Sequence, residues 1–135
     1  MKEKILIVED SVIHQKIYEI FLSSREKFVL LCASNGREGL EVLAANPDVS
    51  MIILDINMPL MSGLEFLKIV KKEESLKDIP VIICSTEGSE EDIIRGLKCG
   101  ASAYIKKPFT SDELLALMNE INKRRMNQNR NNGSL

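Results

Sequence analysis

MIILD, residues 51–55, is an apolar run that ends in a carboxylate, and similar runs recur along the chain. Short runs of Ile, Leu and Val without alternating polar positions are typical of strands that are buried on both faces of a parallel sheet. We therefore expect a strand wherever such a run occurs, with helices between the strands. The expected strands cover residues 4–9, 28–33, 51–55, 81–85 and 103–105.

The segments between these runs have the spacing of amphipathic helices. The first helix is expected from Ser11 to Ser23, with Asp10 or Ser11 as its N-cap. Gly100 is expected to end the fourth helix, because glycine readily adopts the left-handed conformation that follows many helices. The remaining helices are expected to begin near residues 36, 63, 89 and 110. The first helix carries Val12, Ile13, Ile17, Ile20 and Phe21 at helical spacing.

Five strands alternating with five helices indicate an α/β protein with a parallel sheet between two helix layers. Right-handed crossovers leave two common doubly wound arrangements, and five strands favour the flavodoxin-like order 2-1-3-4-5. The first and third strands are then neighbours, so Glu9, Asp10 and Asp55 should lie side by side. We expect one domain over residues 1–125 and a disordered tail over 126–135, where the polar, Asn-rich sequence has no apolar period.

The composition excludes several classes of protein. With 135 residues and 44% hydrophobic content, the chain can form one domain with its own core, and its net charge of −2 gives no reason to expect nucleic-acid binding. No segment approaches the ~20 apolar residues of a membrane span, and the first apolar run is too short for a signal peptide. The cysteines Cys32, Cys84 and Cys99 lack metal-ligand spacing. We expect buried free thiols in a reducing compartment, with the cytoplasm as the location.

Polar residues stand at the ends of four expected strands. Glu9 and Asp10 follow the first, Asp55 ends the third, Ser85 ends the fourth and Lys107 follows the fifth. The carboxyl ends of parallel strands share one edge of a sheet, where ligand sites gather, so these residues should meet. Three adjacent carboxylates repel one another unless a proton or a cation neutralises them. A set of oxygen ligands favours a hard ion such as Mg²⁺.

Such a site suits phosphoryl transfer. Asp55 can act as a nucleophile toward phosphorus, as carboxylates do when they form aspartyl phosphates. Mg²⁺ would offset charge on the equatorial oxygens and Lys107 would pair with another oxygen, while the Ser85 hydroxyl could donate a hydrogen bond to the phosphoryl group.

Over residues 3–122 the chain resembles a bacterial response-regulator receiver domain of two-component signalling. The order and spacing of the motifs together are much more specific than any single motif. The matching motifs are ILIVED at 5–10, DINMP at 55–59 with SG at 62–63, PVIICS at 80–85, GA at 100–101 and YIKKPF at 104–109.

The resemblance implies a role for each site residue. Asp55 would accept a phosphoryl group from a sensor histidine kinase or a histidine phosphotransfer protein. Asp10 would ligate Mg²⁺ directly and Glu9 would reach it through water. The backbone carbonyl of Asn57 would be a further ligand.

The resemblance also implies a switch that links the phosphoryl group to a binding surface. Ser85 would be the switch hydroxyl, and Tyr104 the switch aromatic that moves inward on phosphorylation. Lys107 would bind the phosphoryl group and would precede Pro108 through a cis peptide bond. The fourth helix, fifth strand and fifth helix would form the output surface for a downstream protein.

Other functions remain to be weighed against this one. A stand-alone receiver, acting in chemotaxis or in a relay, is preferred, and the alternative is a receiver fragment of a longer transcription factor or enzyme. Neither would act on an external substrate, because a receiver catalyses only its own phosphotransfer and dephosphorylation. A Mg²⁺-dependent aspartyl phosphohydrolase would need a general acid at position 57, where this chain has Asn57. A flavodoxin-like cofactor binder would need a Gly-rich phosphate loop and stacking aromatics, which the strand ends lack.

Some residues have simpler interpretations than a functional one. His14, the only histidine, is expected on the surface of the first helix rather than as a phosphate carrier. The basic run at 123–125 suits a helix C-terminus better than nucleic acid. Thr86 would slow access to the phosphoryl group, whereas Asn57 and Glu87 resemble regulators that lose phosphate quickly, so the phosphate lifetime stays open.

Overall fold

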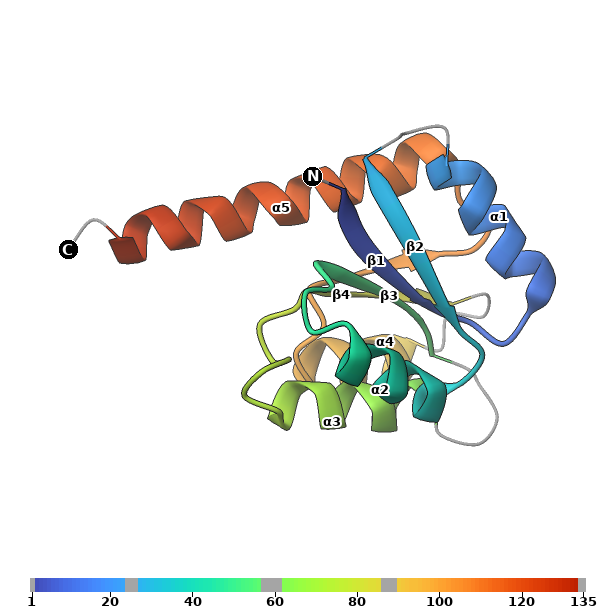
Figure 1. Cartoon of the computed structure of the whole chain (residues 1–135), viewed down its shortest axis with the longest axis horizontal. Coiled ribbons are helices and arrows are strands. Elements are labelled where there is room, and N and C mark those ends of the chain that lie inside the picture. The colour runs from blue at the N-terminus through green and yellow to red at the C-terminus, as the bar shows by residue number, and fades with distance from the viewer. Residues whose placement is uncertain (1, 24–26, 57–61, 86–89, 134–135) are drawn as a thin grey trace.

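The protein forms one five-stranded parallel sheet in the order β2-β1-β3-β4-β5, with helices between the strands (Figure 1). The computed structural model describes residues 2–23, 27–56, 62–85 and 90–133. The predicted fold class and strand order are therefore confirmed. The strands are β1 (Glu3–Val8), β2 (Phe28–Ala33), β3 (Met51–Asp55), β4 (Val81–Ser85) and β5 (Ala103–Lys106), and the helices are α1 (Val12–Ser23), α2 (Gly36–Ala45), α3 (Gly63–Lys72), α4 (Glu90–Lys98) and α5 (Ser111–Gly133).

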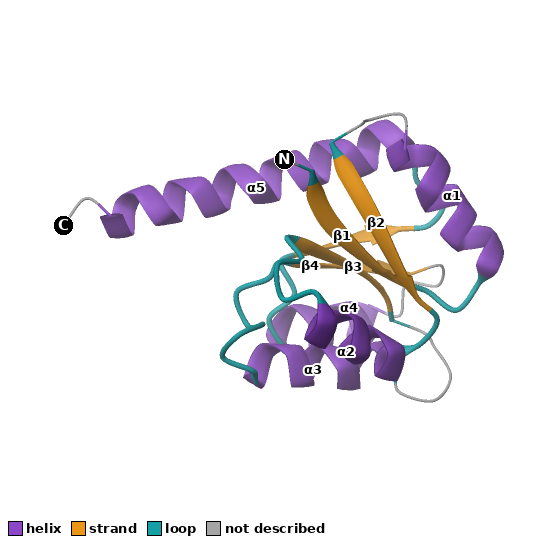
Figure 2. Ribbon diagram, viewed as in Figure 1, coloured by secondary structure: helices purple, strands orange, loops and turns teal. Residues whose placement is uncertain are grey.

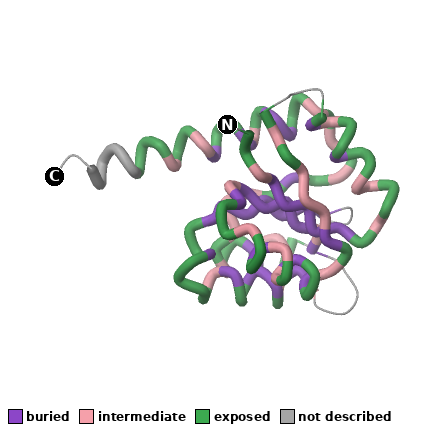
Figure 3. The backbone as a smooth tube through the Cα atoms, viewed as in Figure 1, coloured by how far each residue is buried: buried purple, intermediate pink, exposed green. Residues whose placement is uncertain are grey.

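The sheet lies between two helix layers, α1 with α5 on one face and α2, α3 and α4 on the other (Figure 2). Successive residues of a strand point to opposite faces, so the central strands serve two cores. In β3, Ile53 belongs to the core that contains Leu22 and Met118, whereas the next residue, Leu54, belongs to the core that contains Phe66. Figure 3 shows buried residues concentrated in the central strands β1, β3 and β4. This two-sided burial explains the uninterrupted apolar runs in the sequence.

α1 packs on the sheet through fewer apolar residues than predicted. It buries Tyr18 and Leu22, which lie four positions apart on one side of the helix. Val12, Ile13 and Ile20 are instead 63%, 71% and 70% exposed. Their helical spacing in the sequence therefore does not correspond to a stripe that faces the core. Apolar residues occur on more than one side of this helix, and the sheet covers only one.

α5 is the longest helix described, and it projects beyond the sheet (Figure 1). Leu114 and Ile121 are buried, and Arg125 still donates a hydrogen bond to the Ser50 carbonyl at 3.3 Å. The helical backbone continues through most of 126–135, where the sequence led us to expect a disordered tail. No described side chain after Arg125 is buried, so this part extends a helix that the core has already nucleated. None of the helices that the structure describes is both long and apolar enough to cross a bilayer.

The register of the strands brings their carboxyl ends to one edge. Val8 of β1 pairs with Leu54 of β3, so the next residues, Glu9 and Asp55, lie level with each other at the end of the two strands. β4 pairs in parallel with β3, and β5 pairs in parallel with β4, so both strands end at the same edge of the sheet. The sheet therefore places the polar residues predicted for the site close together.

Candidate functional site

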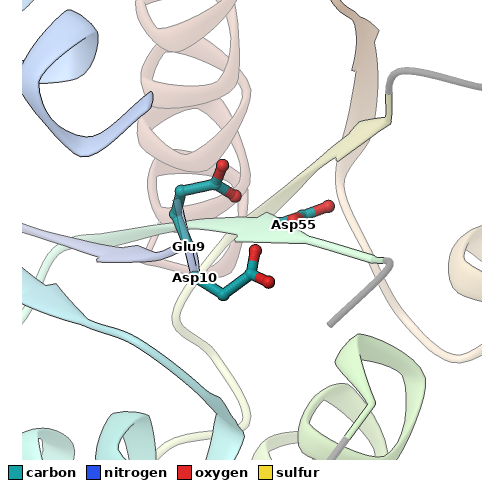
Figure 4. A group of neighbouring side chains, drawn as sticks. All are labelled: Glu9, Asp10 and Asp55. Carbon is teal, nitrogen blue, oxygen red and sulfur yellow. The ribbon is translucent and has the colours of Figure 1, made fainter. Parts of the chain in front are cut away.

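Three carboxylates form an acidic cluster at the carboxyl edge of the sheet. One oxygen from each of Glu9, Asp10 and Asp55 lies within 4.8 Å of the others, and Figure 4 shows the three side chains at the ends of β1 and β3. Glu9 is 1% exposed, Asp55 is partly buried and Asp10 is exposed. The cluster thus runs from the protein interior to solvent, and it unites the three carboxylates that the sequence placed at this edge.

A close approach between α3 and the end of β3 fixes the backbone beside the cluster. A Cβ atom on Gly63 would lie 2.6 Å from the Asp55 carbonyl oxygen and 2.7 Å from the Cα atom of Ile56, so glycine is required there. Ser62 caps the helix, because its hydroxyl accepts a hydrogen bond from the Glu65 backbone N–H at 3.2 Å. The first turn of α3 therefore rests directly on the strand end that carries Asp55.

Lys107 reaches the cluster from the end of β5 and forms an ion pair with Glu9. Its Nζ atom lies 3.2 Å from Glu9 Oε1, and the two side chains are 10% and 2% exposed. The Lys107 backbone N–H donates to the Ser85 carbonyl at 2.8 Å, which extends the pairing of β4 and β5 by one residue. The bond from Lys107 to Pro108 is cis, as the resemblance implied. With so little exposure, each charge depends on its protein partner.

His14 also contacts Glu9, which the sequence reasoning missed. Its Nδ1 atom lies 2.5 Å from Glu9 Oε1 and 3.1 Å from Lys107 Nζ. The tautomer decides whether Nδ1 donates to Glu9 or accepts from Lys107. The tautomer with a hydrogen on Nδ1 pairs it with Glu9, the shorter of the two contacts, and Nδ1 then cannot accept a hydrogen bond from the lysine. The signal for this contact was position: His14 lies one helical turn after Asp10, on a helix that begins at the same edge of the sheet.

The second carboxylate oxygen of Glu9 is a possible ligand atom for the predicted metal ion. Oε2 is buried and has no hydrogen-bond partner among the residues that the structure describes. Leaving a buried carboxylate oxygen unsatisfied is costly, and a cation held with Asp10 would satisfy it. The all-oxygen donor set and its opening to water fit Mg²⁺. The predicted Asn57 ligand lies outside the described residues, as do Thr86 and Glu87.

The two predicted switch residues differ in exposure. Ser85 is 4% exposed at the end of β4, at the edge that carries the cluster, whereas Tyr104 on β5 is 49% exposed. Ile94 and Leu97 of α4 are likewise 49% and 40% exposed. Tyr104 therefore has the outward placement from which the resemblance implies an inward movement.

An apolar pocket of about 460 Å³ opens beside the cluster, between α1 and the loop that follows β5. The Phe109 ring lies 5.8 Å from the Tyr18 ring and 5.9 Å from the Phe21 ring. His14 and Lys107 also line the pocket, so it adjoins the polar site directly.

Behind this pocket, Tyr18 donates a hydrogen bond to the Sγ atom of Cys84 at 3.1 Å. Burial raises the pKa of the Cys84 thiol to about 12, and it also raises the pKa of Tyr18 well above its ordinary value. Burial likewise raises the pKa of Cys32. All three cysteines are free thiols, as predicted, but only Cys84 is buried, whereas Cys32 and Cys99 are partly exposed.

A doubly wound sheet with an acidic cluster and a lysine at its carboxyl edge defines the receiver class of signalling domain. The chain belongs to the response regulator receiver domain family, which matches residues 5–119. Members of this family are phosphorylation switches of two-component systems that accept phosphoryl groups from histidine kinases and bind Mg²⁺ at an acidic pocket.

Chemotaxis proteins are among the similar proteins. The chain is 37% identical over 118 residues to the chemotaxis protein CheY homolog of Campylobacter jejuni, covering 87% of this chain and 91% of that one. It is 40% identical over 111 residues to chemotaxis protein CheY1 of Helicobacter pylori, covering 82% and 90%. The solved structure of chemotaxis protein CheY4 from Vibrio cholerae has a TM-score of 0.82 at 31% identity, covering 89% of this chain and 98% of that one.

Proposed function

We propose that this receiver domain accepts a phosphoryl group on Asp55 from a histidine kinase or a histidine phosphotransfer protein. The observation that carries the proposal is the meeting of Glu9, Asp10 and Asp55 within 4.8 Å, with Lys107 paired to Glu9 at the same edge. Asp55 ends a strand whose backbone is held by the contact with Gly63. The backbone atoms that carry the Asp55 carboxylate are therefore held in position.

The proposed transfer uses groups that stand at this edge. An Asp55 carboxylate oxygen forms a bond to phosphorus while the bond from phosphorus to the donor imidazole nitrogen breaks, and the electron pair stays on that nitrogen. Lys107 offsets charge on one phosphoryl oxygen, and the Ser85 hydroxyl donates a hydrogen bond to the group. When bound by Glu9, Asp10 and Asp55, with Asn57 as a further predicted ligand, Mg²⁺ would offset further charge.

The phosphoryl group would then change the surface formed by α4, β5 and α5. It adds about −2 charge and strong hydrogen-bond acceptors next to Ser85. Movement of Ser85 toward it would allow Tyr104 to turn inward and would bias a two-state surface. Tyr104, Ile94 and Leu97 are exposed on β5 and α4, which suits a surface that binds a downstream protein.

We further propose that the chain acts as a stand-alone receiver in the cytoplasm and is no enzyme toward external substrates. Chemotaxis relatives that it covers over 90% or more of their length support this. The alternative is a receiver from a longer regulator. The probable transcriptional regulator ycf29 of Pyropia yezoensis supports it, because the chain is 36% identical to only 54% of that protein. The phosphohydrolase alternative is disfavoured because Asn57 cannot act as a general acid.

Intact-protein mass after incubation with Mg²⁺ and acetyl phosphate tests the proposal. We expect one added phosphoryl group that hydroxylamine removes, because hydroxylamine cleaves acyl phosphates. Asp55→Asn should remain unmodified, whereas Asp48→Asn, at an exposed carboxylate paired with Lys4, should behave like the wild type.

Three outcomes would contradict the proposal. A phosphoryl group that stays on Asp55→Asn would exclude Asp55 as the acceptor. A wild-type protein that neither gains mass nor binds beryllofluoride in Mg²⁺ would argue against a phosphorylation site altogether. Release of inorganic phosphate from unrelated phosphate esters would favour the phosphohydrolase.

A further inference from the structure

We propose that His14 is a positioning residue for the phosphorylated state. It would hold the Glu9 carboxylate in place when Lys107 turns from Glu9 to the phosphoryl group. This inference rests on the function proposed above, and it concerns a contact that belongs to this chain's own α1.

In the structure, one oxygen of Glu9 serves two partners. Glu9 Oε1 lies 3.2 Å from Lys107 Nζ and 2.5 Å from His14 Nδ1, and the carboxylate is almost fully buried. Water therefore cannot readily replace either partner. Any process that draws Lys107 away from Glu9 leaves His14 as the only remaining partner of Oε1 that these contacts provide.

Phosphorylation is such a process. A phosphoryl group on Asp55 brings about −2 charge to the edge of the sheet where Lys107 ends. The ammonium then binds the more highly charged group, since charge-assisted hydrogen bonds to phosphate oxygens are strong. The phosphorylated state is accessible only if Glu9 tolerates the loss of its lysine.

The first turn of α1 is built around Glu9, so His14 need not move to meet this demand. The His14 backbone N–H donates to the Ser11 hydroxyl at 3.2 Å, which fixes the start of the helix. The next side chain, Gln15, donates to the Glu9 backbone carbonyl at 2.6 Å. Two consecutive residues of α1 thus contact Glu9: His14 contacts its carboxylate and Gln15 its backbone carbonyl.

Beryllofluoride, which mimics an aspartyl phosphoryl group, allows a direct test in saturating Mg²⁺. Binding would be followed by titration calorimetry. His14→Leu keeps an apolar side chain against the pocket but removes the donor, and we expect roughly tenfold weaker binding, the scale of one hydrogen bond to a charged group. His14→Asn places an amide N–H near the position of Nδ1 and should restore most of the affinity.

A double-mutant cycle shows whether the effect passes through Glu9. In a Glu9→Gln background the buried charge is gone, so His14→Leu should change beryllofluoride binding by no more than about twofold. Thermal unfolding of each metal-free variant would establish that it is folded before its binding is compared.

Each outcome decides between the hypotheses. Binding to the wild type with equal binding to His14→Leu overturns the role of His14 and leaves the proposed function intact. Weak binding to His14→Leu without rescue by His14→Asn, or with the same loss in Glu9→Gln, would show that His14 acts through packing and would overturn the inference. A wild type that binds no beryllofluoride overturns both.

Discussion

Tyr18 of α1 and Cys84 of β4 are joined by a hydrogen bond of 3.1 Å inside the core. Cys84 immediately precedes Ser85 and pairs in register with Asp55. This single contact therefore links the helix that borders the apolar pocket to the strand that carries Ser85, the predicted switch hydroxyl. Burial raises the pKa of both groups, so both stay protonated in the folded protein well above neutral pH.

The stability of the fold should fall in alkali. The Cys84 pKa is raised from 9.0 to about 12 in the folded protein, so the unfolded chain loses this proton first. The stabilisation is complete below pH 9 and is lost as the pH rises from 9 toward 12. At pH 10 this one group should lower the free energy of unfolding by roughly 1 kcal/mol.

Urea unfolding at pH 8 and pH 10 measures this effect, with Cys84→Ala as the comparison. Cys84→Ala should be less stable than the wild type at pH 8. Its free energy of unfolding should fall by a smaller amount than that of the wild type between pH 8 and pH 10. Tyr18 and Cys32 act in the same direction, so a smaller slope should persist. Identical slopes in the two proteins would mean that Cys84 is not the responsible group.

Tyr18→Phe should lower the free energy of unfolding by about 1 kcal/mol, because it removes the hydroxyl but keeps the ring beside Phe109. Tyr104→Phe is the matched control, since its ring is 49% exposed, and it should change stability by less than about 0.5 kcal/mol. Urea unfolding at pH 7 checks both, and an equal effect of the two substitutions would show that the buried hydroxyl contributes nothing specific.

Gly63→Ala should disturb both stability and the site. The new methyl group would clash with the backbone of Asp55 and Ile56, so α3 must shift. This shift should lower the free energy of unfolding by about 1–3 kcal/mol. Beryllofluoride binding should weaken as the end of β3 moves. Ser62→Ala is the control. It removes the N-cap of α3 and should lower the free energy of unfolding by about 1 kcal/mol. It leaves the end of β3 in place, so beryllofluoride binding should be unchanged. Unchanged binding in Gly63→Ala would show that the site adapts to the shift.

Lys107→Met should change the binding of cation and anion in opposite directions. Without the ammonium beside Glu9, the acidic cluster is more negative, and Mg²⁺ affinity should rise roughly threefold to tenfold. Beryllofluoride should bind more weakly, because its charge has lost a partner. Calorimetric titration of each ligand would measure this, with the exposed neighbour Lys106→Met as the control. A parallel loss of both ligands would indicate that Lys107 supports the structure of the site instead.

Removal of residues 126–135 should change the free energy of unfolding by less than about 0.5 kcal/mol, since no described side chain after Arg125 is buried. Circular dichroism should still show a loss of helical signal, because α5 reaches Gly133. Ile121→Ala, inside the packed part of α5, should instead cost about 2–5 kcal/mol. A large loss on truncation would mean that the domain extends beyond residue 125.

The sheet and the acidic cluster could be predicted because their signals are local. An apolar run such as 51–55 can be buried on both faces only in a central strand, and a carboxylate at its end must emerge at the ligand-binding edge. Right-handed crossovers left two common strand orders, and the presence of five strands favoured the order that is observed. Glu9, Asp10 and Asp55 come together for these reasons alone.

The features that could not be predicted depend on how helices are rotated and how far they continue. Whether His14 faces solvent or Glu9 depends on the rotation of α1 about its axis, and the apolar residues on several sides of α1 gave no clear answer. The extension of α5 past Ile121 has no apolar pattern to mark it, since it needs no contact with the core.

β5 forms one margin of the sheet, and its outer side has no neighbouring strand within the described sheet. An unpaired margin can add a strand from another molecule and so begin aggregation. β5 has only four residues and ends in a lysine, features that discourage such addition. Tyr104 on β5 can therefore stay exposed to a partner protein, while the short strand resists pairing with the sheet of a second molecule.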